Sequence, residues 1–94
     1  MIDGNITEFI DSLYYGQEIV FIFKDKKYFI QGWWSEDRKR TTMVLTDVND
    51  NTPGYLWKHE ADSMIECAEA FLAAPIWDEK DFLQIQEDVI WSDW

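Results

Sequence analysis

The stretch that most constrains the fold is Glu18–Gln31, in which two apolar runs flank a four-residue charged segment, Lys24–Lys27. Both runs are rich in β-branched and aromatic residues, and a short polar break between such runs is typical of a β-hairpin. Every residue of Ile19–Phe23 is apolar, so both faces of this strand are apolar. A strand of this kind is expected in the middle of a sheet, covered on both sides.

The chain after the hairpin has the pattern of further strands joined by short connections. Gly32–Trp34 continues or bulges the second strand, and Ser35–Arg40 is a charged turn. Thr41–Asp47 predicts a third strand from its β-branched residues and alternation. Val48–Gly54 is dense in Asn, Asp, Pro and Gly and predicts a loop, followed by a short fourth strand at Tyr55–His59. The succession predicts an antiparallel meander of about four strands.

The N-terminal segment Ile2–Tyr15 has the periodicity of an amphipathic helix. Asn5 or Thr7 can cap its start, and Gly16 follows its last periodic residue, where a left-handed cap is common. The helix would therefore lead directly into the hairpin. Its apolar stripe consists of Ile6, Phe9, Ile10 and Leu13.

Two further helices are predicted in the C-terminal third. Ser63 and Glu66 fit a capping box, and Pro75 ends the helix that follows. The acidic segment 78–81 supplies a cap and a first turn for a short last helix. Residues 89–94 form either a closing strand or an exposed aromatic tail. The expected fold is α+β, with an N-terminal helix, the meander and two C-terminal helices.

Length and composition favour one domain, residues 1–94, with a core that needs no cross-link. The single cysteine, Cys67, cannot form an internal disulfide, which fits a reducing compartment. No basic-then-apolar leader is present in residues 1–16, and no apolar run reaches the roughly 18 residues of a membrane span. We therefore expect a soluble, cytoplasmic protein.

The net charge of −11 arises from 19 acidic and 8 basic residues and is unevenly distributed. Residues 1–59 hold nine acids and seven bases, whereas residues 60–94 hold ten acids and one base, Lys80. Such a negative field repels nucleic acid and raises the encounter rate with basic surfaces. The same charge also fits a protein in which it serves solubility alone.

A calcium loop is suggested only by the spacing of Asp47, Asn49 and Asn51. An EF-hand would require glycine where Thr52 stands and a bidentate glutamate where Lys58 stands. A lysine at that ligand position indicates a turn and not a calcium site.

Zinc binding and nucleophilic catalysis lack the residues they require. His59 and Cys67 are the only strong zinc ligands, and Asp62 and Glu66 would complete a poor set. The acidic neighbours Glu66 and Glu69 would raise the pKa of the Cys67 thiol and lower its reactivity. No glycine-rich phosphate loop or nucleophile elbow occurs. We therefore expect that the chain is not an enzyme and that it binds no metal and no cofactor.

Basic residues cluster only in two predicted turns, at Lys24–Lys27 and Arg38–Arg40. Nucleic-acid-binding domains are usually basic overall, so direct nucleic-acid binding is not expected. Solubilising turns at the ends of a sheet explain these clusters.

Tryptophans are the remaining candidates for a binding function. Adjacent strand residues point to opposite faces, so Trp33 and Trp34 cannot both enter one core. Exposed tryptophan beside charge is common in binding hot spots, although each indole could equally wrap over an edge of the sheet. The six are Trp33, Trp34, Trp57, Trp77, Trp91 and Trp94.

Two segments resemble a known group of proteins. They are FIDSLYYGQEIVFIFKDKKYFIQGW (Phe9–Trp33) and S-x-x-E-C-A-E-A-F-L-A-A-P-I-W-D (Ser63–Asp78). Over most of the chain, to about Trp91, the sequence resembles small uncharacterised acidic proteins of Gram-positive bacteria and their mobile elements. The shared motifs are structural: the junction at Gly16 and the capped helix ending at Pro75. The resemblance implies a setting in which small acidic proteins act as antitoxins, immunity proteins or phage inhibitors of host defence, including anti-CRISPR proteins.

We expect a non-enzymatic inhibitor that binds a basic protein, such as a nuclease, a toxin or another nucleic-acid-handling factor. Carboxylates would stand in for phosphates, and tryptophans would supply the desolvated anchor. The predicted contact residues are Glu60, Asp62, Glu66, Glu69, Asp78, Glu79, Asp81, Glu87, Asp88, Trp77, Trp91 and Trp94.

The alternative is a small self-associating module in which the charge is incidental. In that case Trp33 or Trp34 would lie at a symmetric contact between copies. A small enzyme would require a buried carboxylate pair with a raised pKa, and no sequence pattern indicates one.

Overall fold

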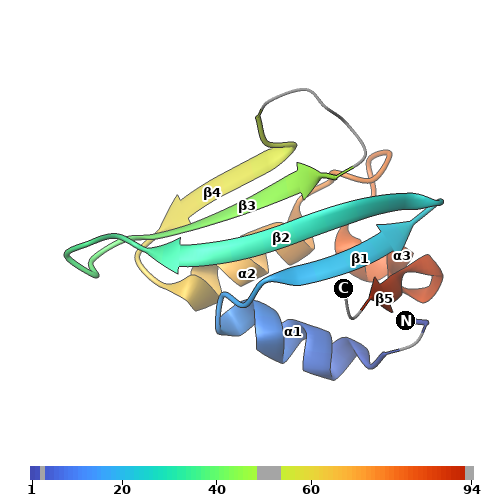
Figure 1. Cartoon of the computed structure of the whole chain (residues 1–94), viewed down its shortest axis with the longest axis horizontal. Coiled ribbons are helices and arrows are strands. Elements are labelled where there is room, and N and C mark those ends of the chain that lie inside the picture. Colours follow the sequence, from blue (N-terminus) through green and yellow to red (C-terminus); the bar gives the residue numbers. More distant parts are fainter. Residues whose placement is uncertain (3, 49–53, 93–94) are drawn as a thin grey trace.

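The computed structural model describes residues 1–2, 4–48 and 54–92, and an antiparallel sheet forms its centre (Figure 1). The elements in chain order are α1 (Ile6–Tyr14), β1 (Ile19–Phe23), β2 (Lys26–Trp34), β3 (Thr41–Asp47), β4 (Trp57–Ala61), α2 (Met64–Ala73), α3 (Phe82–Ile85), the 3-10 helix η1 (Gln86–Asp88) and β5 (Ile90–Ser92). The five strands lie side by side in the order β4-β3-β2-β1-β5, and the helices lie on one face of the sheet. The predicted α+β class is confirmed.

The central hairpin is tighter than predicted. Phe23 pairs with Lys26, which leaves only Lys24 and Asp25 in the turn. Both turn residues have positive φ, 51° and 63°, the combination used by two-residue hairpin turns whose twist matches that of the strands. The predicted four-residue break is therefore wrong, and β2 begins two residues earlier, at Lys26.

The predicted meander is confirmed for β1 to β4, with β3 at the expected residues. The fourth strand is shifted from Tyr55–His59 to Trp57–Ala61, because the β3 ladder pairs Leu45 with Trp57 and Thr41 with Ala61. Residues 49–53 of the predicted loop lie outside the described residues.

A fifth strand closes the sheet at its other edge. Of the two alternatives for residues 89–94, the closing strand is confirmed for β5, which pairs with β1 through Phe21 and Trp91. The backbone of Ile2 binds the far side of β5, with its N–H donating to the Val89 carbonyl at 2.8 Å. Both ends of the described chain therefore meet at this edge.

The two faces of β1 have different surroundings. Ile19, Phe21 and Phe23 face the helices and belong to the core. Val20, on the opposite face, is also buried, although no described helix lies on that side (Figure 1). Both faces of β1 are therefore largely buried, as expected, but the described helices cover only one of them; Val20 lies opposite Phe29 in the ladder.

Helix α1 begins and ends at the predicted signals. The Asn5 side chain accepts a hydrogen bond from the Thr7 N–H at 2.8 Å. Gly16 follows the helix with a φ of 68°, a conformation that glycine adopts without the steric cost of a Cβ.

The two later helices also begin at side-chain caps. Ser63 Oγ accepts from the Glu66 N–H at 3.2 Å, but the Glu66 carboxylate accepts from the Asp62 N–H and not from Ser63. Asp81 and Gln84 form a reciprocal capping box at α3. The predicted acidic first turn at 78–81 is therefore wrong, since only Asp81 reaches that helix and the preceding residues form a separate turn.

An aromatic cluster joins the helices to the sheet. Phe9 of α1 stacks on Phe82 of α3 with ring centroids 4.8 Å apart. Phe21 of β1 meets both rings edge-on at 5.9 and 5.5 Å, and Phe71 of α2 lies 5.4 Å from Phe82. Each helix is held on the sheet through this cluster, which fixes which side of the helix faces outward.

Candidate interaction surface

The outward sides of the helices carry acids and no bases. Six exposed carboxylates lie in α1, α2 and η1, and none of the four helical segments contains Lys or Arg. We call these residues the acidic helical face: Glu8, Asp11, Glu66, Glu69, Glu87 and Asp88. None of them forms an ion pair with another described residue.

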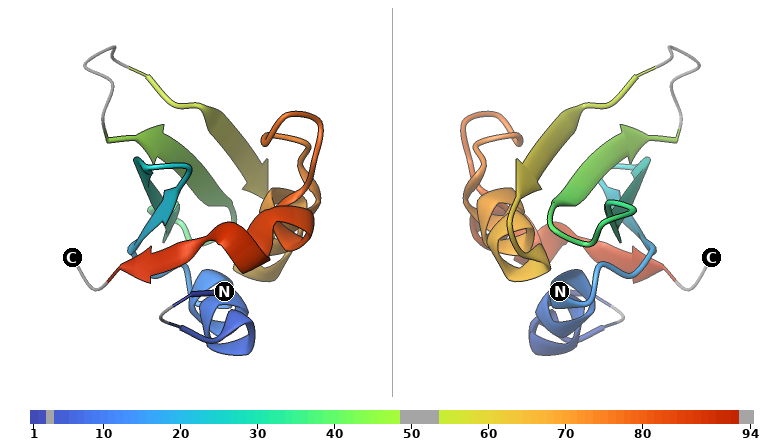
Figure 2. Two further views of the ribbon diagram at one scale, coloured as in Figure 1. Left: turned by 90° about the vertical axis from the view of Figure 1, so that its right-hand side faces the viewer. Right: turned by 90° about the vertical axis from the view of Figure 1, so that its left-hand side faces the viewer.

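The helical periodicity explains this placement. In α1, Phe9 and Leu13 are buried, and Glu8 and Asp11 fall between them on the outward side. Helix α2 follows the same rule with a wider buried stripe. Because α1 packs beside α2 and α2 beside α3, their outward sides adjoin (Figure 2).

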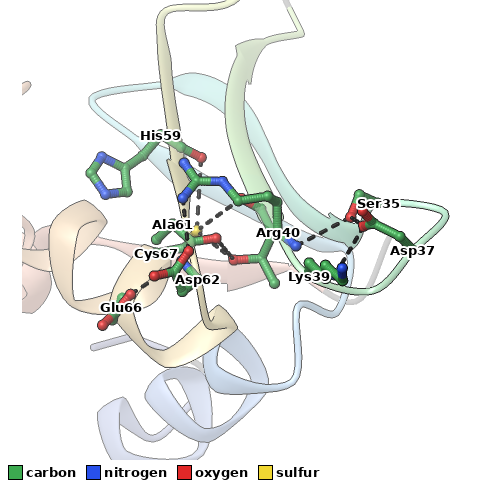
Figure 3. Close-up of polar contacts among 10 residues, drawn as sticks. Ser35, Asp37, Lys39, Arg40, His59, Ala61, Asp62, Glu66 and Cys67 are labelled. Carbon is green, nitrogen blue, oxygen red and sulfur yellow. Dashed lines mark hydrogen bonds and ion pairs between the residues drawn. The ribbon is translucent and has the colours of Figure 1, made fainter.

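Three predicted contact acids form exposed ion pairs and lie outside this face. Asp62 binds Arg40 at 2.8 Å, as Figure 3 shows. Asp78 lies 3.4 Å from Lys24 Nζ. On β4, Glu60 lies 3.5 Å from Lys58 Nζ. Their charges are partly compensated, so these three carboxylates are weaker candidates for binding a basic partner than the helical ones.

The remaining predicted acids are divided between a turn, a cap and the helices. Glu79 is exposed in the turn after Trp77, and Asp81 accepts the Gln84 N–H as the α3 cap. Glu87 and Asp88 lie in η1 and belong to the acidic helical face. The structure therefore brings together only part of the predicted set.

The predicted tryptophan anchors are not exposed as expected. Trp77 is only 5% exposed and packs against Phe21 and Phe23, so the expectation that its indole is available to a partner is wrong. Trp91 is half-buried with its ring edge-on to Phe9, and Trp94 lies outside the described residues. In the run Ala73–Trp77, Ala73 and Pro75 are exposed and only Trp77 is buried, so the chain returns to the core at Trp77.

Among the described tryptophans, two others are exposed. Trp33 is 41% and Trp34 46% exposed at the end of β2. Their adjacency on a strand places the two side chains on opposite faces of the sheet. Sequence reasoning did not predict Glu8 and Asp11 as contact residues, because it summed the charge over segments of the chain and not over the outward sides of the helices.

The basic turn at the same end of β2 is ordered by Asp37 (Figure 3). Its carboxylate accepts from Ser35 Oγ at 2.6 Å and from the Lys39 N–H at 3.0 Å. The Ser35 hydrogen bond, followed by that from the Lys39 backbone, lowers the pKa of Asp37 below its ordinary value of 3.8. Arg40 leaves the turn toward Asp62.

Cys67 lies in the interior and not at a reactive surface. Its Sγ is 3.2 Å from Thr41 Oγ1 and 3.7 Å from the carbonyl oxygen of His59 (Figure 3). No group of three His, Cys, Asp or Glu side chains in the described part of the chain is placed to hold a metal ion. Asn49 and Asn51 of the calcium-like spacing lie outside that part.

None of the helices described is long and apolar enough to cross a membrane. No family model, no curated protein and no solved structure matches this chain.

Proposed function

We propose that the chain is a non-enzymatic inhibitor that binds a basic, nucleic-acid-handling protein through its acidic helical face. The observation that carries this proposal is the segregation of charge: the helical segments α1, α2, α3 and η1 hold six exposed carboxylates and no base. The bases lie in the β1–β2 turn, at the start of β2, in the β2–β3 turn, on β4 and at Lys80 in the loop before α3.

Unpaired carboxylates on a rigid surface suit a basic partner. The helices fix their backbone positions, so the carboxylates are held in one arrangement on the surface, and they can approach arginine and lysine side chains that otherwise bind phosphates. Two exposed apolar side chains lie on the same helices, Ile65 in α2 and Leu83 in α3, each 50% exposed. They can supply the apolar contact for which the sequence suggested Trp77.

The test is capture of a partner from a bacterial lysate on the immobilised chain, with elution in rising salt, followed by affinity measurements on the purified partner. One variant neutralises an acid in each of α1, α2 and η1: Asp11→Asn, Glu69→Gln and Glu87→Gln. A matched control neutralises three exposed acids outside the helices: Glu18→Gln, Asp25→Asn and Glu36→Gln.

Both variants change the net charge by the same amount. A difference in affinity between them therefore reports the position of the neutralised carboxylates and not the overall negative charge. The helical variant should weaken binding at least about tenfold, because three interfacial charges are lost together. The control should change the affinity by less than about threefold. Equal losses in the two variants would refute a specific acidic surface, and a partner that is not basic would refute the proposed class.

The exposed pair Trp33 and Trp34 favours a second candidate, the self-associating module. One sheet face has no described helix on it, and Trp33 lies on that face opposite Thr42. Sedimentation at tens of micromolar separates the candidates. A dimer that dissociates in Trp33→Ser would favour self-association, whereas a strict monomer would remove this candidate.

A further inference from the structure

The two edges of the sheet differ in how they are closed. At the β5 edge the backbone of Ile2 binds the outer side of the strand, through hydrogen bonds with Val89 and Trp91. At the other edge β4 pairs with β3, and no residue in the ranges 1–2, 4–48 and 54–92 pairs with its outer side. An edge strand of this kind carries unpaired backbone N–H and C=O groups, which can pair with a further strand.

The surface beside β4 is open along the middle of the strand. An open hollow of about 370 Å³ is lined by Lys58, His59 and Glu60. Successive strand residues point to opposite faces of a sheet, so a hollow that all three residues line lies at the edge of the strand. The outer side of β4 therefore has room for another chain.

The side chains of β4 are divided between the two faces of the sheet. Trp57 and Ala61 pack against the core, and the His59 ring lies parallel to the indole of Trp57 with centroids 5.9 Å apart. Lys58 and Glu60 lie on the opposite face, where their side chains are 51% and 53% exposed. Their charged atoms are 3.5 Å apart, so the strand presents one ammonium and one carboxylate side by side.

This order of residues is self-complementary when two copies of β4 pair antiparallel. Paired residues of one sheet share a face, so a two-fold axis perpendicular to the sheet passes through a residue of the strand. With the axis at His59, Lys58 of each copy lies opposite Glu60 of the other. With the axis one residue away in either direction, two Lys58 or two Glu60 side chains would face each other, which is unfavourable.

The same register suits the other face of the strand. It places Trp57 of each copy opposite Ala61 of the other, a large side chain beside a small one. A lysine on an edge strand commonly prevents pairing with another chain. Here the glutamate two residues later removes that protection, because it supplies the opposite charge at the facing position.

We propose that the chain forms a homodimer through the outer edge of β4, with the two-fold axis at His59. The two five-stranded sheets then join into one continuous sheet, and two Lys58–Glu60 ion pairs link the copies. A five-residue strand buries less than the roughly 1,000 Å² of a stable interface, so the Kd is on the order of 0.1–1 mM. The contact uses neither the acidic helical face nor Trp33, so it is independent of both functions considered above.

The test is an NMR dilution series of the ¹⁵N-labelled chain from about 2 mM to about 20 µM, at constant ionic strength, following the assigned backbone amide signals. The signals of Trp57–Ala61 should shift together along one dimerisation curve, and those of Trp33 and Trp34 should not. Unshifted signals for Trp57–Ala61 up to about 2 mM, or shifts centred on Trp33, would overturn the proposal.

Charge reversal on β4 tests the pairing itself. Lys58→Glu places like charges at both cross-strand positions and should raise the Kd at least about tenfold. Glu60→Lys should do the same for the opposite sign. Lys39→Glu, an equal change of charge in the β2–β3 turn, is the matched control and should change the Kd less than about threefold. Equal effects of Lys58→Glu and Lys39→Glu would overturn the proposal.

Mixing the two β4 variants tests the register and shows that both have folded. An equimolar mixture of Lys58→Glu and Glu60→Lys again places opposite charges at both positions, so the mixed dimer should form with a Kd within about threefold of the wild type. The double variant Lys58→Glu with Glu60→Lys keeps the net charge of −11 and should also self-associate. A loss of association that neither the mixture nor the double variant restores would overturn the assigned register.

Discussion

At the scale of single residues, Asp37 shows how one hydroxyl can set the charge state of an exposed turn. Its two hydrogen bonds favour the ionised form and lower its pKa below 3.8. Because the folded pKa is depressed, the contribution of this group to stability is complete above the ordinary aspartate pKa and is lost as the pH falls through the folded value.

Replacing Ser35 should therefore raise the pKa of Asp37. In Ser35→Ala the carboxylate loses the 2.6 Å hydrogen bond, its largest stabilising contact, and the pKa should return toward 3.8. A pH titration of the carboxyl ¹³C signal measures this. Arg38→Gln keeps both hydrogen bonds and serves as the control. An unchanged Asp37 pKa in Ser35→Ala would contradict the assigned cause.

Gly16 provides a second test at this scale. Its φ is 68°, and a Cβ there would lie 2.6 Å from Met64 Cε. Gly16→Ala should lower the free energy of unfolding by at least about 1–2 kcal/mol, measured by urea denaturation.

Gly32→Ala is the matched control for the backbone contribution. A Cβ at Gly32 would meet the same methionine, 2.6 Å from its Sδ, but without a positive φ. Because a Met64 side chain can move, the loss at Gly32 should be smaller. An equal loss in the two variants would show that the contact, and not the left-handed backbone, dominates.

At the scale of elements, the caps test why α2 begins where it does. Ser63→Ala removes the acceptor of the Glu66 N–H and should cost about 0.5–2 kcal/mol of stability in thermal unfolding. Glu66→Gln keeps an oxygen that can accept from the Asp62 N–H and loses only the charge near the helix start, so its cost should be about 0.3–1 kcal/mol. A greater loss in Glu66→Gln than in Ser63→Ala would contradict this ranking.

Elements with strong local signals could be predicted from the sequence, and those set by pairing could not. Asn5, Gly16 and Ser63 mark helix ends through contacts with near neighbours in the chain. The bounds of β4 depend instead on its ladder with β3, and β5 is only three residues long and pairs with β1 on one side and with Ile2 on the other. The two-residue turn was missed because Lys24–Asp25 lacks the glycine that usually marks it.

The candidate surface was only partly predictable for the same reason. Counting charge along the chain found the acids of α2 and η1 but not Glu8 and Asp11, which join them only when α1 packs beside α2. The exposure of a tryptophan depends on whether its segment returns to the core. The segment of Trp77 returns to the core and that of Trp33 does not, and no local sequence pattern distinguishes the two.

At the scale of the whole molecule, the excess of negative charge should oppose folding. Six unpaired carboxylates on one side repel one another, whereas the three ion pairs are all exposed and contribute little. Raising NaCl from about 20 to about 500 mM screens this repulsion and should raise the Tm by a few degrees. A lower Tm at high salt would mean that the exposed ion pairs outweigh the repulsion.

The most direct test of the central claim is whether the chain and nucleic acid compete for the same basic site. A fluorescent DNA duplex of about 20 base pairs is bound to the captured partner and titrated with the chain, at two salt concentrations. The wild type should release the duplex completely, and the variant lacking Asp11, Glu69 and Glu87 charges should require at least about tenfold more protein. A stable complex that contains the partner, the duplex and the chain together would contradict the claim.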